Sequence, residues 1–138
     1  MIVLDTNVLA ELVRREPAEA VVRWLTGQRP ASIFVTAITQ AEMLSSVESV
    51  PSGKRRIQLA GAIGKIFTEE FAGRILPFDE EVAPVYARIV SDRRRAGRPI
   101  SQLDAMIAAI ARTRSASVAT RNGASLAGCG IALVNPWA

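Results

Sequence analysis

The sequence contains no histidine and only one cysteine, Cys129. Without imidazole, the chain cannot build a Ser-His-Asp triad, a paired-histidine nuclease or a histidine zinc site. One thiol cannot hold zinc by itself, and it cannot act as a nucleophile without a neighbouring base. Any metal must therefore be held by oxygen ligands, which favours Mg²⁺ or Mn²⁺. We expect Cys129 to be a buried, reduced thiol in a cytoplasmic protein.

Long hydrophobic runs are also absent, although 49% of the residues are hydrophobic. The longest apolar stretches span only a few residues, so we expect no membrane span, and the excess is available for burial. Asp5 interrupts the apolar start and no basic segment precedes it, which argues against a signal peptide. At 138 residues, we expect one domain over residues 1–138.

Acidic residues are fewer than basic ones, and none occurs after Asp104. Seventeen lysines and arginines oppose thirteen acids, for a formal net charge of +4 at pH 7. The only lysines are Lys54 and Lys65, so the basic excess is mostly arginine. Clustered arginines fit phosphate backbones, but they are also typical of solvated helix faces. Basicity alone therefore leaves nucleic-acid binding open.

The start of the chain places a carboxylate where α/β proteins bind ligands. The apolar run over residues 2–4 predicts a strand buried on both faces, and Asp5 falls at its carboxyl end. In open α/β sheets, ligands bind in the crevice beyond the strand ends. However, Asp5 or Thr6 can equally cap a helix that continues through Val13. Position alone leaves both interpretations open.

Strand and helix patterns alternate along the rest of the chain. Short apolar segments predict strands over residues 33–36, 75–77, 117–119 and 131–134. Between them, helical spacing predicts helices that open at Pro17, Thr39, Lys54, Asp79 and Ser101. Asp79 is the predicted cap of its helix. The helix that opens at Lys54 should run to about residue 71. Consecutive strands should then be parallel, with helices on both faces. We therefore predict an α/β fold, a three-layer α/β/α sandwich around a mainly parallel sheet of four to five strands.

Three carboxylates belong to predicted helix starts. Asp5 ends the first strand, while Glu42 and Asp104 close patterns typical of capping boxes that open with Thr39 and Ser101. Helices that start from one sheet edge point their N-termini into a common crevice, and their dipoles keep nearby carboxylates ionised. The helix of Asp104 follows a loop instead of a strand, so Asp104 lies at this edge only if the preceding helix brings the chain back across the sheet. Each acid can cap a helix, bind a metal or do both.

Five short motifs follow one another along the whole chain. They are IVLDTNVL at residues 2–9, TQAE at 39–42, GRPI at 97–100 followed by DAMIAAIA at 104–111, ATRN at 119–122 and NPW at 135–137. Each motif is weak alone, but the order resembles that of the PIN-domain ribonucleases. The resemblance is to the VapC toxins of bacterial toxin–antitoxin pairs, in the branch that includes FitB-like proteins.

This resemblance implies a PIN-like fold and a Mg²⁺- or Mn²⁺-dependent endoribonuclease toxin that hydrolyses RNA phosphodiester bonds. Asp5, Glu42 and Asp104 stand at the positions that hold the metal in the family. Family members often carry a fourth acid, where this chain offers only the neutral Asn122 and Ser125. We expect Asn122 to complete the catalytic set, and one fewer charge should weaken binding of a second ion.

Four polar residues beside these acids are candidates for substrate binding: Thr6, Asn7, Thr120 and Arg121. They can position a water molecule or the RNA backbone, although the same residue types suit helix caps and turns. The toxin resemblance further implies a VapB-like antitoxin that occupies a groove of the toxin, and a homodimer.

Two other functions remain open from the sequence. A PIN module whose neutral fourth position has cost it catalysis would bind RNA or a partner protein without turnover. A phosphotransfer domain would use Asp5 as acceptor, but residues 5–7 lack a second acid and a receiver domain would also need a neighbouring acidic pair. We therefore favour the nuclease.

Overall fold

A five-stranded parallel sheet forms the centre of the computed structural model, which describes residues 1–138. Its strand order is β3-β2-β1-β4-β5, so the first strand lies in the middle. The strands are β1 (Ile2–Leu4), β2 (Ile33–Thr36), β3 (Ile75–Leu76), β4 (Ser117–Ala119) and β5 (Leu133–Val134). All five predicted strands are confirmed, and the third and fifth are shorter than predicted. Pro77 ends β3 because it has no N–H for the ladder.

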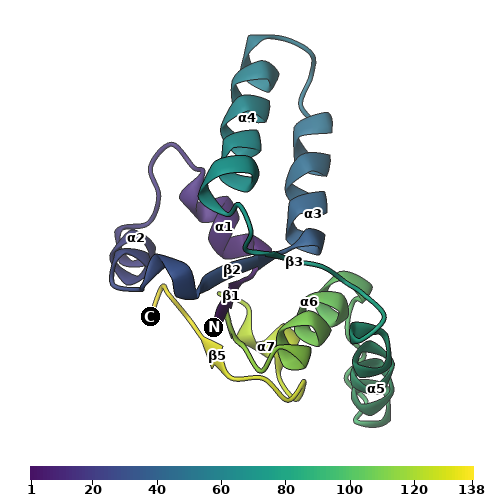
Figure 1. The fold of residues 1–138 in the computed structure, drawn as a ribbon. Coiled ribbons are helices and arrows are strands. Elements are labelled where there is room, and N and C mark those ends of the chain that lie inside the picture. Colours follow the sequence, from purple (N-terminus) through teal and green to yellow (C-terminus); the bar gives the residue numbers. More distant parts are fainter.

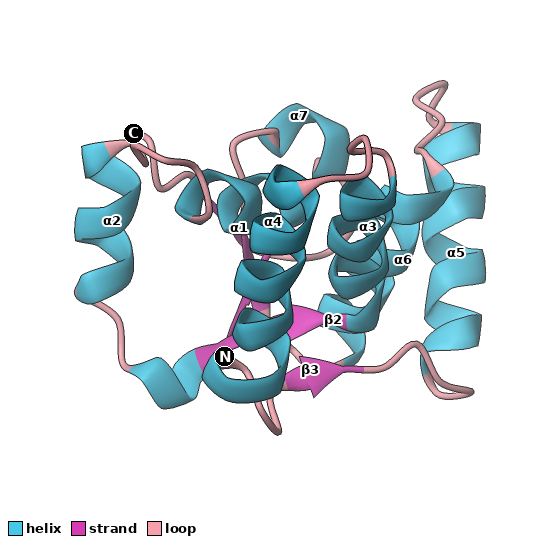
Figure 2. Cartoon of the chain, turned by 90° about the horizontal axis from the view of Figure 1, so that it is seen from above, coloured by secondary structure: helices cyan, strands magenta, loops and turns pink.

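Helices cover both faces of this sheet, as Figure 1 shows. They are α1 (Thr6–Leu12), α2 (Glu19–Thr26), α3 (Ala37–Glu48), α4 (Lys54–Lys65), α5 (Val82–Arg95), α6 (Gln102–Thr113) and α7 (Gly123–Leu126). The pair α3 and α4 projects from the sheet as a hairpin, while α5 to α7 lie on the other side. In Figure 2, α2 and α5 lie at opposite ends of the molecule. None of the helices has both the length and the apolar character needed to cross a membrane.

Alternating side chains of the strands supply a separate core on each face. Val3 and Val118 are register partners and pack into the cluster that α5 and α6 cover. The next pair, Leu4 and Ala119, packs into the cluster beneath α1, α3 and α4. Because successive side chains in a strand point to opposite faces, one three-residue strand feeds both layers. The predicted three-layer sandwich is confirmed.

The predicted start of α3 is wrong. Thr39 does not open this helix, because the Thr36 hydroxyl at the end of β2 accepts the Thr39 N–H at 3.1 Å. The helix therefore begins at Ala37, and Glu42 lies in its second turn instead of closing a capping box. Here a cap supplied by the strand itself overrides the sequence pattern.

Other helix boundaries differ less from the predictions. The Ser101 cap of α6 is confirmed, since its hydroxyl accepts the Asp104 N–H at 3.3 Å. Asp79 accepts the N–H groups of Glu81 and Val82 at 3.1 and 3.3 Å, as predicted for the start of α5. The helix predicted from Pro17 begins at Glu19. The long helix predicted from Lys54 continues beyond α4 as a π-helical turn, Ile66–Glu70.

Candidate active site

Asp5 lies at the carboxyl end of the central strand and is almost fully buried, with 6% of its surface exposed. Its Oδ1 accepts the Thr6 N–H at 2.8 Å, which makes Asp5 the N-cap of α1. Its Oδ2 accepts the Thr120 hydroxyl at 2.8 Å and the Asn7 amide at 3.4 Å. Asp5 therefore caps a helix and lies at the predicted crevice at the same time.

Burial raises the pKa of the Asp5 carboxyl above its ordinary value. The hydrogen bonds from Thr120 and Thr6 act in the opposite direction, while the negative charge of Asp104 raises this pKa further. Asp104 is half-buried in the first turn of α6, and no residue of the chain donates a hydrogen bond to its carboxylate. The structure thus brings two carboxylates from distant segments within range of each other's charge.

Glu42 is connected to the same region through Thr6. Its Oε1 accepts the Thr6 hydroxyl at 2.7 Å, and the Thr6 backbone N–H binds Asp5. One threonine at the start of α1 thereby contacts two of the predicted acids. Glu42 also lines a shallow hollow between α3 and α6 whose far side is Leu103, the residue before Asp104. Glu42 thus faces the start of α6.

The segment after β4 is linked to the start of α1 by a second set of hydrogen bonds. Asn7 donates its side-chain amide to the Thr120 hydroxyl at 3.1 Å and accepts the Arg121 N–H at 3.2 Å. The Asn122 N–H donates to the same hydroxyl at 3.0 Å. The Asn122 side chain is exposed and makes no hydrogen bond, and the Arg121 guanidinium lies over the Trp137 ring at 5.0 Å.

These residues provide an oxygen-only donor set without a cationic partner. None of Asp5, Glu42 and Asp104 forms an ion pair with lysine or arginine, although the chain has seventeen such residues. Neighbouring carboxylates without a protein counter-ion suit a hard divalent cation. No three acidic or cysteine side chains are close enough together to hold one ion by themselves. The oxygen-only donor chemistry therefore suits a hard divalent cation, and Mg²⁺ or Mn²⁺ stays a prediction.

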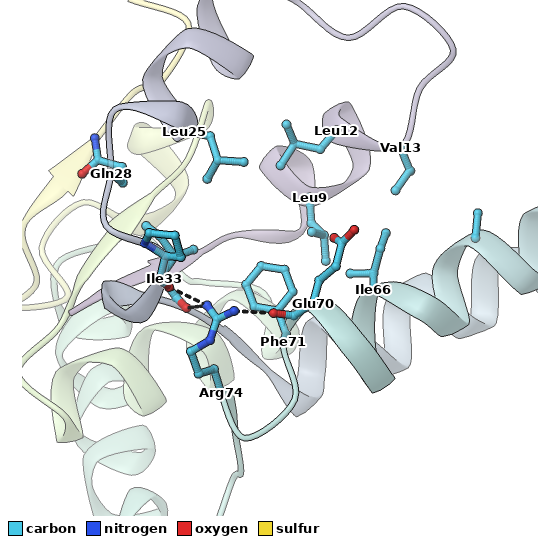
Figure 3. Close-up of a pocket in the computed structure, with 12 residues that line it drawn as sticks. Leu9, Leu12, Val13, Leu25, Gln28, Ile33, Ile66, Glu70, Phe71 and Arg74 are labelled. Carbon is cyan, nitrogen blue, oxygen red and sulfur yellow. Dashed lines mark hydrogen bonds between the residues drawn. The ribbon is translucent and has the colours of Figure 1, made fainter.

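A separate groove of about 620 Å³ lies between α1, α2 and the end of α4, and its lining includes none of Asp5, Glu42 and Asp104. Figure 3 shows its mostly apolar lining, which includes Leu9, Leu12, Val13, Leu25, Ile66 and Phe71. Arg74 closes one end by donating hydrogen bonds to the carbonyls of Pro30, Ile33 and Glu70. The sequence did not predict the location of this groove, because its lining comes from four separate segments.

Comparison with protein families matches residues 2–126 to the PIN domain. The chain belongs to the PIN-domain family. The toxin FitB of Neisseria gonorrhoeae is 42% identical over 137 residues, which cover 99% of both chains. The VapC ribonuclease Y4jK of Sinorhizobium fredii is 36% identical over 137 residues, covering 99% of this chain and 98% of the relative.

Among solved structures, FitAB bound to an IR36 DNA fragment matches this PIN domain with a TM-score of 0.94. That match has 42% sequence identity and covers 100% of this chain and 96% of the other. The resemblance to VapC- and FitB-type PIN proteins is confirmed, as is the PIN-like fold. Two residues that the sequence did not predict for the site, Thr36 and Thr39, continue the hydrogen bonds behind Thr6 through their hydroxyls.

Proposed function

We propose that the chain is a metal-dependent endoribonuclease, the toxin of a type II toxin–antitoxin pair, that hydrolyses RNA phosphodiester bonds. The observation that carries this proposal is the buried Asp5 at the end of the central strand, near Asp104 and without a cationic partner. The chain is similar over almost its whole length to proteins named as a toxin and as a ribonuclease, and this similarity supports the same activity.

Asp5, Glu42 and Asp104 would hold Mg²⁺ or Mn²⁺, with the Asn122 carbonyl as a further neutral ligand. When bound, the ion lowers the pKa of a water molecule and stabilises negative charge on the attacked phosphate. The chain's own residues prepare this site: Thr6 and Thr120 hold the two oxygens of Asp5. Asp5 is thereby kept in one orientation, which limits the cost of arranging ligands around the ion.

Thr6, Asn7, Thr120 and Arg121 are the proposed substrate-binding residues. The hydrogen bond that the Arg121 backbone N–H donates to the Asn7 side-chain oxygen keeps the segment after β4 beside the start of α1. Arg121 is exposed, with its guanidinium over the Trp137 ring, and would offer a positive charge to a phosphate of the RNA backbone. Thr6, Asn7 and Thr120 contribute by orienting the carboxylates and their hydrogen-bonded waters.

A VapB-like antitoxin is the partner that we propose for the groove between α1, α2 and α4. An apolar groove of this size suits the nonpolar face of a peptide helix. Exposed Leu44 and Leu103 support the proposed homodimer, because 45% and 44% of their surfaces remain exposed on adjoining helices. We place this activity in the cytoplasm, where the RNA lies.

The decisive experiment is cleavage of an RNA pool containing transfer, ribosomal and messenger RNA with added Mg²⁺ or Mn²⁺. We expect cleavage that EDTA abolishes and that Asp5→Asn combined with Asp104→Asn removes. Asp92→Asn is the control, since Asp92 is an exposed acid on α5 outside the site. Full cleavage by the double variant, or by wild type in EDTA, would refute the proposal.

The second candidate function is binding of RNA or a partner without turnover. The neutral and exposed Asn122, with no acid after Asp104, favours it. It predicts RNA retention in a gel-shift assay and no cleavage at any metal concentration.

A further inference from the structure

We propose that a line of three threonine hydroxyls, Thr36, Thr39 and Thr6, positions the Glu42 carboxylate for the metal. This inference rests on the proposed function, because it assumes that Glu42 is a metal ligand. The Thr36 hydroxyl lies 3.4 Å from that of Thr39, which lies 2.9 Å from that of Thr6. The Thr6 hydroxyl then reaches Glu42 Oε1 at 2.7 Å.

The hydrogen bonds in this line all point toward Glu42. An ionised carboxylate only accepts, so the single hydroxyl hydrogen of Thr6 is donated to Glu42. Thr39 must then donate its own hydrogen to Thr6, and Thr36 donates to Thr39. Thr36 in turn accepts the Thr39 N–H at 3.1 Å. Hydrogen bonds arranged head to tail polarise one another, so the last one is strengthened by those behind it.

Burial makes the line rigid. Thr36 and Thr39 both have 0% of their surface exposed. Water therefore cannot replace their hydroxyls as partners, and each rotamer is held by the surrounding core. The line also joins three elements, because it runs from the end of β2 through the first turn of α3 to the start of α1. Glu42 is oriented by the core of the fold.

Thr39 is the residue in which this role can be tested separately. Thr36 also caps α3 and Thr6 also binds Asp5, but every partner of the Thr39 hydroxyl belongs to the line. The rest of the side chain packs in the core, where valine would fill the same space without a buried hydroxyl. Packing alone therefore does not explain threonine at this position. Glu42 Oε2 accepts no hydrogen bond from the chain and stays available to an ion.

The test compares Mn²⁺ binding by wild type, Thr39→Val and Thr39→Ser, measured on the full chain by electron paramagnetic resonance. Residues that orient metal ligands typically contribute about 10- to 100-fold in metal affinity. We expect Thr39→Val to weaken Mn²⁺ binding by about 10-fold, at the lower end of that range. Thr39→Ser keeps the hydroxyl and should bind almost as tightly as wild type. RNA cleavage by Thr39→Val should need correspondingly more Mn²⁺ and recover when the metal saturates.

Thr113→Val is the matched control. Its hydroxyl donates to the Ala109 carbonyl at 2.7 Å, so the substitution removes a helical hydroxyl that has no link to Glu42. Equal Mn²⁺ affinity of wild type and Thr39→Val would overturn the inference while leaving the nuclease in place. Absence of Mn²⁺ binding by wild type would overturn the proposed function, and the inference with it. If Thr39→Val does not fold, Thr39→Ala is measured in the same way and decides by the same criterion.

Discussion

Asp5 shows how one side chain serves both the fold and the site. It caps α1 through Oδ1 and meets Thr120 through Oδ2, so both oxygens are engaged in a buried position. The structure confirms Asp5 as the helix cap, and metal binding by Asp5 stays a prediction. In this position the Asp5 carboxylate loses hydration and lies within range of the Asp104 charge, and both effects raise its pKa. The stability of the folded protein should therefore depend on pH.

We expect Asp5→Asn to stabilise the metal-free protein more at neutral than at acidic pH. Burial raises the folded-state pKa of Asp5 above its ordinary value of 3.8, so the folded state holds this proton to higher pH than the unfolded chain does. The contribution of Asp5 to the free energy of unfolding therefore falls as pH rises from 3.8 through the folded-state pKa. Asparagine does not ionise, so Asp5→Asn lacks this decrease in the free energy of unfolding.

The measurement is urea unfolding of wild type and Asp5→Asn in EDTA at a series of pH values from acidic to neutral. Asp92→Asn, at an exposed position, should follow wild type at every pH. A stability difference between Asp5→Asn and wild type that does not grow with pH would contradict the explanation.

Asn122 provides the second prediction at this scale. Asn122→Asp should tighten Mn²⁺ binding several-fold and increase RNA cleavage at low Mn²⁺, because an added carboxylate raises the ligand charge. The side chain is exposed and makes no hydrogen bond, so the change should leave stability within about 0.5 kcal/mol of wild type. Titration with Mn²⁺ and a cleavage assay test this, and unchanged affinity would remove Asn122 from the proposed ligand set.

At the scale of elements, Arg93 connects the end of α5 to two other segments. This arginine is in the last turn of α5 and is 6% exposed, yet it has no acidic partner. Its guanidinium donates to the carbonyls of Arg98, Ser125 and Ala127 at 2.7, 2.9 and 2.8 Å. The first acceptor precedes α6 and the other two belong to the end of α7 and its exit. Arg93 thus connects the loop before α6 to the end of α7.

We expect Arg93→Met to lower the free energy of unfolding by about 2–4 kcal/mol. A fully buried carbonyl left without a donor costs about 1–3 kcal/mol, and these three acceptors are only partly buried, so each loses less than that. Methionine keeps an unbranched apolar side chain, so the loss reports mainly on the hydrogen bonds. Urea unfolding measures the change. Arg94→Met, at the exposed neighbouring position, should stay within about 0.5 kcal/mol of wild type. Equal stability of the two variants would show that these bonds contribute little.

For the whole molecule, the acids and the apolar groove occupy different places, so nuclease activity and antitoxin binding should be separable. Glu42 and Asp104 belong to the region between α3 and α6, whereas the groove is lined by α1, α2 and the end of α4. An antitoxin in the groove would act on the acids through α1, whose first residue is Thr6. This helix contributes to both places.

Leu25→Glu should weaken binding of the cognate antitoxin by more than about 10-fold, because burying an unpaired charge in an apolar groove costs several kcal/mol. RNA cleavage should remain, since Leu25 lies outside the site. Val22→Glu is the control, as Val22 is exposed on the same helix and does not line the groove. Titration of each variant with the product of the neighbouring reading frame tests this. Equal binding by Leu25→Glu and wild type would place the antitoxin elsewhere.

The sequence alone determined the succession of strands and helices along the chain and identified Asp5, Glu42 and Asp104 as the candidate acids. Buried strands such as residues 2–4 consist of consecutive branched apolar residues, and amphipathic helices repeat at their own period, so both are visible locally. Only the tertiary structure decided which partner each polar group takes. The Thr36 hydroxyl accepts the Thr39 N–H, so α3 starts earlier than predicted. Thr6 donates a hydrogen bond to Glu42, which lies 36 positions further along the chain. Such contacts depend on how separate segments pack, which no local pattern records.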